Sequence, residues 1–93
     1  MSKFIQDLNI GKNIQKLRKM KGFTQENICA KLDLAGRPMI RSTYAQIETG
    51  KRNIFVSDLI AIKNILNVEY EDIFNDLQPI NKYESNSFFN DKT

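Results

Sequence analysis

The sequence is poor in the residues that build cross-links, metal sites and catalytic centres. Its 93 residues include one cysteine, Cys29, and no histidine. A single cysteine excludes an intrachain disulfide, and without histidine the chain lacks the mixed nitrogen and sulfur ligands of a structural zinc site. A chain this small must then be stabilised by packing alone or by an oligomer. We expect no metal and no cofactor.

Long apolar runs are also missing. The longest run near residue 60 covers only Leu59 to Ile62, whereas a membrane-spanning helix needs about 20 apolar residues. The opening MSKFIQDL does not show the basic and then apolar pattern of a signal peptide. These observations predict a cytoplasmic protein with no membrane partner.

Groups for catalysis are equally scarce. The sequence has no glycine-rich phosphate loop, no nucleophile with a recognisable base, and no paired carboxylates. A small helical domain also offers little concave volume for a substrate. We therefore predict that the protein is not an enzyme.

The residues that are present indicate one globular domain with a basic central part. Hydrophobic residues make up 41% of the chain and charged residues 27%, which allows a modest core and a polar surface. The net charge is only +3, but between Gly11 and Arg52 ten lysines and arginines face three acidic residues. A basic block of this kind is typical of a protein that binds a polyanion.

Apolar residues recur with helical spacing, and no segment alternates as a strand would. We expect five short helices, bounded by capping residues and glycines. In chain order, their markers are Ile10, Ile14, Leu17 and Met20 before Gly22; Thr24 as N-cap with Ile28 and Leu32; Tyr44 and Ile47 before Gly50; Ser57 as N-cap with Leu59, Ile62, Ile65 and Leu66 before Asn67; and Ile73 with Phe74. This pattern predicts an all-α fold.

The domain is expected to cover residues 10–74. Residues 1–9 form an N-terminal extension whose Phe4, Ile5 and Leu8 either add a helical turn or cover the core. Residues 75–93 form a polar, asparagine-rich tail that we expect to be largely irregular. Phe88 and Phe89 in this tail either dock on the domain, a twin or a partner protein, or belong to a loose tail.

Three motifs, in order and at matching distances, carry a family resemblance. They are I-x3-I-x2-L-R-x3-G-F-T-Q-E-N-I from Ile10, R-S-T-Y-A-Q-I-E-T-G-K-R-N at 41–53, and I-L-N-V-E-Y-E-D-I-F at 65–74. With these motifs the chain resembles the Cro and phage-repressor type of helix-turn-helix domain, also called the xenobiotic-response-element family. The resemblance implies a compact five-helix, lambda-repressor-like fold whose second and third helices form the helix-turn-helix.

The resemblance also implies roles for residues outside the third helix. The family commonly joins an arginine of its first helix to a glutamate ending its third, here Arg18 and Glu48, so we expect a structural ion pair. Gln25 stands where the family places a glutamine that holds a DNA phosphate. Cys29 stands where the family usually has alanine, which suits a small, buried and unreactive thiol.

The third helix matches the recognition helix, whose first residues meet base edges in the major groove. Because Tyr44 and Ile47 are expected to face the core, the outward-facing residues are the candidate readers. The predicted base-reading residues are Arg41, Ser42 and Gln46. The predicted phosphate contacts around them, which position the protein without specifying a sequence, are Thr43, Lys51, Arg52 and Asn53.

The chain departs from the family between the second and third helices. The connection from Asp33 to Ile40 is roughly five residues longer than usual, a lengthened turn. It either extends over the DNA backbone, where Arg37 adds a phosphate contact, or is a tolerated surface insertion, since doubling a loop costs only about 0.6 kcal/mol. Ile40 replaces the usual capping hydroxyl, so either Ser42 caps a shorter helix or Pro38 begins a longer one.

The sequence thus predicts a sequence-specific regulator of transcription that binds double-stranded DNA, most simply as a homodimer on two half-sites. The resemblance implies a repressor of its own or a neighbouring operon, of the kind found among phage repressors, restriction controllers and antitoxins. The alternative is a protein-interaction module that keeps the fold and binds a partner protein through the C-terminal tail.

Overall fold

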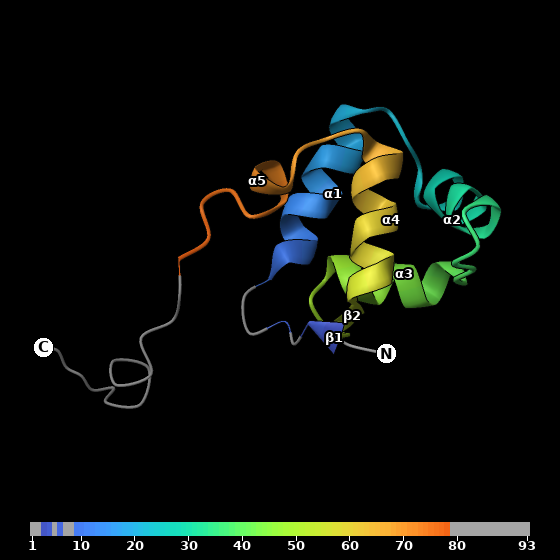
Figure 1. The fold of residues 1–93 in the computed structure, drawn as a ribbon, viewed down its shortest axis with the longest axis horizontal. Helices are drawn as coiled ribbons and strands as arrows, with labels where there is room; N and C mark the ends of the chain where they lie inside the picture. The colour runs from blue at the N-terminus through green and yellow to red at the C-terminus, as the bar shows by residue number, and fades with distance from the viewer. Residues whose placement is uncertain (1–2, 5, 7–8, 79–93) are drawn as a thin grey trace, which may run out of the picture.

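The computed structural model describes residues 3–4, 6 and 9–78, and most of them are helical (Figure 1). In this part of the chain the helices are α1 (Ile10–Met20), α2 (Gln25–Leu34), α3 (Arg41–Glu48), α4 (Val56–Leu66) and α5 (Tyr70–Ile73). α3 packs against α1 and α2, α2 also packs against α4, and α5 packs against α1. The predicted all-α fold with a helix-turn-helix at α2 and α3 is confirmed.

The core consists of the apolar residues that recur with helical spacing. Its fully buried members come from all five helices and from the segment before α4: Ile14, Ile28, Leu32, Tyr44, Ile47, Ile54, Ile62, Leu66 and Ile73. Met20 does not belong to this set, because 79% of its surface is exposed. It is the last residue of α1, where the chain turns away from the core.

Helix starts agree with the sequence at α2 but not at α3 or α4. Thr24 and Asn27 form a reciprocal capping box at α2. Helix α3 begins at Arg41 with Ile40 in the N-cap position and no side-chain cap, so neither Ser42 nor Pro38 fills the predicted role. At α4 the N-cap is Phe55, so the prediction that Ser57 caps this helix was wrong.

Helices α2 and α3 each end at a glycine, of which the sequence predicted Gly50 but not Gly36. After α3, Gly50 has φ +79°, and the Lys51 amide donates to the Gln46 carbonyl at 2.9 Å. After α2, Gly36 has φ +81°, and the Arg37 amide donates to the Leu32 carbonyl at 2.9 Å. Both are Schellman turns, which need a left-handed residue after the helix. The lengthened connection is therefore residues 35–40, two residues shorter than predicted because α2 continues through Leu34.

The N-terminal extension is partly a strand, which the sequence did not predict. β1 (Lys3–Phe4) pairs antiparallel with β2 (Ile54–Phe55), with Lys3 opposite Phe55 and Phe4 opposite Ile54. The prediction of an added helical turn was wrong for these residues because backbone pairing with a distant segment satisfies their hydrogen bonds. Ile5 and Leu8 lie outside the described residues, as do Phe88, Phe89 and the rest of 79–93.

Helices α1 and α3 approach each other closely at Gly11. A Cβ atom added to Gly11 would lie 2.8 Å from the Glu48 Cα and nearer still to the Ile47 carbonyl oxygen. Both neighbours are backbone atoms, so they cannot turn aside as a side chain can. Gly11 therefore allows the C-terminal end of α3 to rest directly on the first turn of α1.

Candidate nucleic-acid interface

Helix α3 has one buried and one exposed face. Tyr44 and Ile47 face the core with 0% and 1% exposure. Arg41, Ser42 and Gln46, the predicted base-reading residues, are all exposed. A short helix anchored by its apolar face thus presents an arginine, a hydroxyl and an amide together, the side-chain types that pair with base edges in a major groove.

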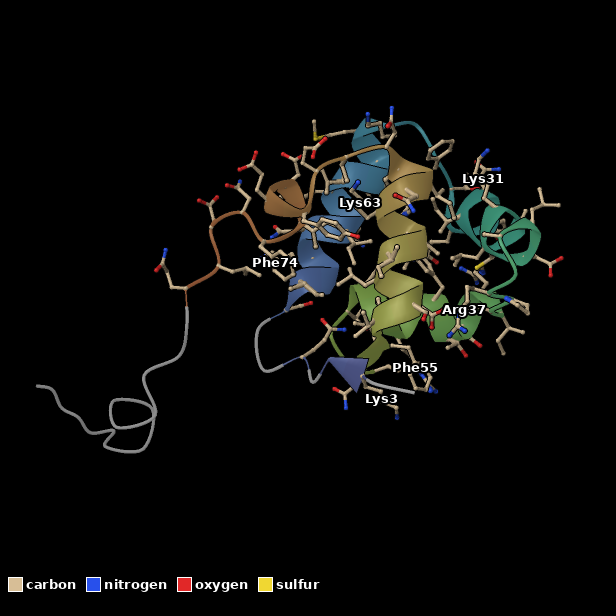
Figure 2. The ribbon with its side chains drawn as sticks, viewed as in Figure 1. Lys3, Lys31, Arg37, Phe55, Lys63 and Phe74 are labelled. Atoms are coloured by element: carbon tan, nitrogen blue, oxygen red, sulfur yellow. The ribbon has the colours of Figure 1, made fainter. Side chains whose placement is uncertain are left out.

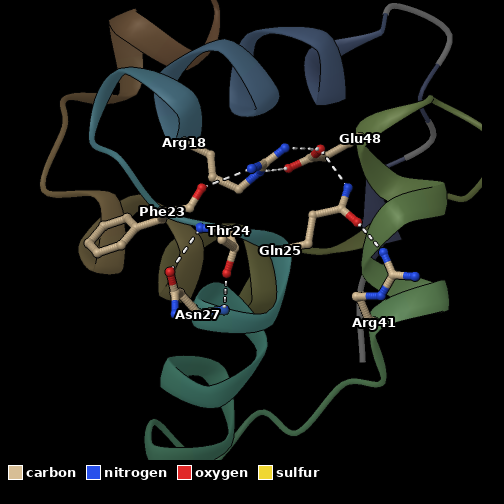
Figure 3. A network of polar contacts seen from close by, with 7 residues as sticks. All are labelled: Arg18, Phe23, Thr24, Gln25, Asn27, Arg41 and Glu48. Atoms are coloured by element: carbon tan, nitrogen blue, oxygen red, sulfur yellow. Dashed lines mark hydrogen bonds and ion pairs between the residues drawn. The ribbon is translucent and has the colours of Figure 1, made fainter.

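A buried ion pair fixes the C-terminal end of α3. Arg18 Nε lies 2.6 Å from Glu48 Oε2, and Arg18 Nη2 lies 3.1 Å from Glu48 Oε1, so the contact is bidentate (Figure 3). Arg18 Nη1 also donates to the Phe23 carbonyl at 2.8 Å. Burial is the largest single influence on Glu48 and opposes its charge, but the contacts with Arg18, Tyr44 and Gln25 together outweigh burial and hold the pKa of Glu48 below its usual value. Arg18 and Glu48 therefore form the ion pair expected from the sequence.

Gln25 extends this contact to the exposed start of α3. Its Nε2 donates to Glu48 Oε1 at 3.0 Å, and its Oε1 accepts from Arg41 Nη1 at 3.0 Å (Figure 3). The carboxylate can only accept and the guanidinium can only donate, so these partners dictate which way the Gln25 amide points. In the free protein Gln25 therefore offers Arg41 an acceptor, while its N–H group faces Glu48 rather than the exposed surface.

Two further contacts hold the exposed side chains of α3. Arg41 Nε lies 3.5 Å from Glu26 Oε2, a solvent-exposed pair between the starts of α3 and α2. Arg52 Nε donates to Gln46 Oε1 at 3.0 Å. A predicted base-reading residue and a predicted phosphate contact are therefore joined, and the Gln46 N–H group is left as its outward donor.

The lengthened turn is fastened to α4 by a salt bridge. Arg37 Nε lies 2.7 Å from Asp58 Oδ1, and the Asp58 side chain is only 9% exposed. Asp58 lies in the first turn of α4, where the helix dipole also favours a negative charge. The turn is thus a folded part of the domain, and the Arg37 side chain is directed to α4.

A groove of about 500 Å³ runs along the flank of α3 that faces the turn and the strands. Its lining includes four of the predicted phosphate contacts and Lys3 of β1; the four are Arg37, Thr43, Arg52 and Asn53. Lys51 is exposed beside them in the loop after α3. The structure therefore brings these cationic and polar groups together on one side of the recognition helix.

Sequence reasoning missed Gln6. This residue hydrogen-bonds to the end of α3 and to the loop that follows, at a sequence separation of 41 to 47 residues. No periodic or capping signal marks a lone glutamine in an extension, so local patterns did not indicate it. Cys29 is only half-buried, whereas the sequence predicted a buried thiol, and burial raises the pKa of this thiol.

Other kinds of site find little support among the described residues. No three His, Cys, Asp or Glu side chains there come together as a metal site requires. A bilayer-crossing helix is likewise absent from residues 3–4, 6 and 9–78, since none of their helices has the length and apolar character for it.

Comparison with known proteins places the chain in a family. A family model described as "Helix-turn-helix" matches residues 14–73. The chain is also similar to the protein named "Control protein C.MunI" from Mycoplasma sp, with 33% identity over 72 residues that cover 76% of this chain and 90% of the relative. A search of solved structures gave no significant match.

Proposed function

Because the chain belongs to the Cro/C1-type helix-turn-helix family, we propose that it regulates transcription by binding a specific sequence in double-stranded DNA. The observation that carries the specific part of this proposal is the exposed polar face of α3. Its opposite face is fully buried and its last residue is held in an ion pair. A reading helix needs this combination, because base contacts discriminate only when the helix is presented at a fixed angle.

In the proposed complex, α3 enters the major groove and α2 lies across the backbone. Arg41 pairs with guanine O6 and N7, held in place by Gln25. Ser42 and Gln46 contact neighbouring bases. The Gln25 amide reaches a phosphate only if its N–H group leaves Glu48, so we assign Gln25 first to the positioning of Arg41.

Phosphate contacts come from the loop after α3 and from the flank of the groove. Lys51, Arg52 and Asn53 follow the recognition helix and are exposed, and Thr43 lies on the same flank. Contacts of this kind add affinity for any duplex and fix the register of the protein. The predicted phosphate role of Arg37 has weaker support, since Asp58 already holds its guanidinium.

We propose that the regulator binds as a homodimer. One recognition helix reads only a few base pairs, and dimers of this type bind two half-sites about 34–36 Å apart. Ile60, Tyr70 and Phe74 on or beside α4 and α5 are each about two-fifths exposed, and α5 packs on α1. These apolar side chains provide a surface for a second copy. Phe74→Asp should then shift the protein toward monomer in sedimentation.

The target is most simply the control region of its own or a neighbouring operon, where the protein acts as a repressor. Among the regulators that the family resemblance offers, a controller agrees best with the name of the similar protein, a control protein. Occupancy of a promoter by a dimer would exclude the polymerase. The operator is expected to be a two-fold symmetric sequence, because a symmetric dimer reads the same half-site twice.

Fluorescence anisotropy with the DNA upstream of the gene tests this proposal. The logarithm of affinity should fall linearly with the logarithm of salt concentration. Arg41→Ala and Gln46→Ala should each reduce discrimination between operator and unrelated duplex by about 1–3 kcal/mol. Lys51→Ala should weaken binding to both duplexes alike and lower the salt slope by about one.

Lys19→Ala is the matched control for these variants. Lys19 is exposed in the last turn of α1, so its substitution removes one positive charge from a helix that the proposed complex does not place against DNA. Its substitution should leave both specificity and the salt slope unchanged. A wild-type protein that shows no salt-dependent binding to any duplex would refute the proposed function.

A further inference from the structure

Gln6 is the centre of a set of hydrogen bonds between the N-terminal segment and the end of α3. Its Nε2 donates to the Arg52 carbonyl at 2.7 Å and to the Ile47 carbonyl at 3.3 Å. Its Oε1 accepts from the Gly11 amide at 3.3 Å, and its own backbone amide donates to Asn53 Oδ1 at 3.1 Å. One residue thus joins α1, α3 and the loop after α3.

The segment that Gln6 holds is the one that carries the proposed phosphate contacts. Residues 51–53 are exposed and lie outside helix and strand, so contacts from another segment determine their position. On one side this loop is fixed by the Schellman turn at Gly50 and on the other by β2, which pairs with β1. Lys3 of β1 lies 5.1 Å from the centre of the Phe55 ring and adds to this attachment (Figure 2).

The chemistry of a primary amide suits this position. The Gln6 side chain has two N–H donors and one carbonyl acceptor, and the structure gives it two carbonyl partners and one amide partner. A carboxylate could still accept from Gly11 but would face two carbonyl oxygens without a donor. The site therefore distinguishes glutamine from glutamate, although the two side chains have nearly the same size.

We propose that Gln6 is a positioning residue for DNA binding, which holds the 51–53 loop in the conformation that meets the phosphates. This inference rests on the proposed function. A loop that is ordered before binding loses less conformational freedom in the complex, and this preorganisation raises affinity. Because phosphate contacts carry no sequence information, Gln6 should contribute equally to operator and to unrelated DNA.

The test compares Gln6→Ala and Gln6→Glu with the wild type in the full-length chain. We expect each variant to bind both duplexes about tenfold more weakly and with a salt slope lower by about one, while the ratio between operator and unrelated DNA stays unchanged. When either Gln6 variant is combined with Lys51→Ala, the loss of binding free energy should be smaller than the sum of the two single losses. Both substitutions act on the same loop, so their effects should not be additive.

Asn13→Ala is the matched control. Asn13 Nδ2 also donates to two backbone carbonyls, those of Ile73 at 2.8 Å and Asn75 at 2.9 Å, but it joins α1 to α5 rather than to the loop. It should lower the melting temperature without changing the salt slope, and it should combine additively with Lys51→Ala. This separates loss of positioning from a general loss of stability.

The outcomes separate this inference from the proposed function. If wild-type protein binds DNA and both Gln6 variants bind with unchanged affinity and slope, the positioning role is refuted and the proposed function stands. The same holds if Asn13→Ala reproduces the Gln6 effects at equal loss of stability. If wild-type protein binds no duplex, both proposals fail. Should Gln6→Ala not fold, Gln6→Glu decides, since it keeps the size and the Gly11 contact.

Discussion

Replacing Glu48 with leucine should remove much of the stability of the domain. The Glu48 side chain is 0% exposed and that of Arg18 is 9% exposed. The substitution leaves the Arg18 guanidinium buried, with the Phe23 carbonyl as its remaining hydrogen-bond partner of those described. Breaking a buried pair from one side costs about 3–5 kcal/mol, because the other charge loses its partner without regaining water.

The expected loss is large relative to the total free energy of unfolding of the domain. Domains of this size are stable by about 5–15 kcal/mol, and each kcal/mol shifts the melting temperature by about 4–8 °C. Glu48→Leu should therefore melt at least about 12 °C below the wild type in thermal unfolding followed by circular dichroism. Urea unfolding should give a lower midpoint with the same slope, because the variant and the wild type expose similar areas when they unfold.

Removing both charges provides the control. In Arg18→Met with Glu48→Leu, two apolar side chains replace the pair, so no buried charge remains and most of the lost stability should return. DNA selectivity should not return, because Gln25 then lacks the acceptor that orients its amide. The reasoning is refuted if Glu48→Leu alone costs less than about 1 kcal/mol, or if the double variant is as unstable as the single one.

The same pair predicts how stability depends on pH in acid. The pKa of Glu48 is lowered in the folded protein: burial raises it, but the contacts with Arg18, Tyr44 and Gln25 together lower it by more. A carboxyl with a lowered pKa stabilises the fold above its unfolded pKa, and this contribution is lost as the pH falls through the folded value. Wild-type protein should lose stability below about pH 4.5, and a Glu48→Gln variant should lose less over the same range.

Three further substitutions test other parts of the structure by urea unfolding. Gly11→Ala should destabilise by about 3 kcal/mol, because the new Cβ meets the backbone of α3; a stabilised variant would show that helix propensity outweighs the contact. Tyr44→Phe should change stability little at pH 7, since the buried Tyr44 hydroxyl makes no hydrogen bond of normal geometry among the described residues and interacts only with the neighbouring Glu48 and Arg18 charges. Burial raises the pKa of Tyr44, so wild-type stability should fall above about pH 10 and that of Tyr44→Phe should fall less. Arg37→Ala should lower the free energy of unfolding by about 2 kcal/mol, because it leaves Asp58 unpaired. It should not change the salt slope of DNA binding. A lower slope would support the phosphate contact that the sequence predicted for Arg37.

The sequence predicted those features that depend on local patterns. Helical spacing identified the buried face of α3 through Tyr44 and Ile47, and glycine identified the ends of α1 and α3. These signals are local because the hydrogen bonds that form a helix or end it span only a few residues. The pair of Arg18 and Glu48 came from the family resemblance, since nothing local relates residues 30 positions apart.

The features that the sequence did not predict depend on distant partners. β1 is two residues long and exists because β2 lies beside it, so its residues need no alternating pattern. The start of α3 at Arg41 lacks a capping side chain, and contacts with α1 and α2 determine it instead. The phosphate contact of Arg37 was predicted from the position of this residue in a long turn. The Arg37 side chain is instead held by Asp58, which lies 21 residues away in the sequence.

The length of α3 explains why distant contacts matter most at the interface. An isolated helix of fewer than about 12 residues is marginal in water, and α3 has eight residues without a capping side chain. Its shape and direction must therefore come from its neighbours. Gln25 hydrogen-bonds to Arg41, the first residue of α3, and Arg18 forms an ion pair with Glu48, its last residue. Rigidity at the proposed reading face is thus supplied by Gln25 and Arg18, which are not among the proposed base contacts, so substitutions at these two positions should change specificity.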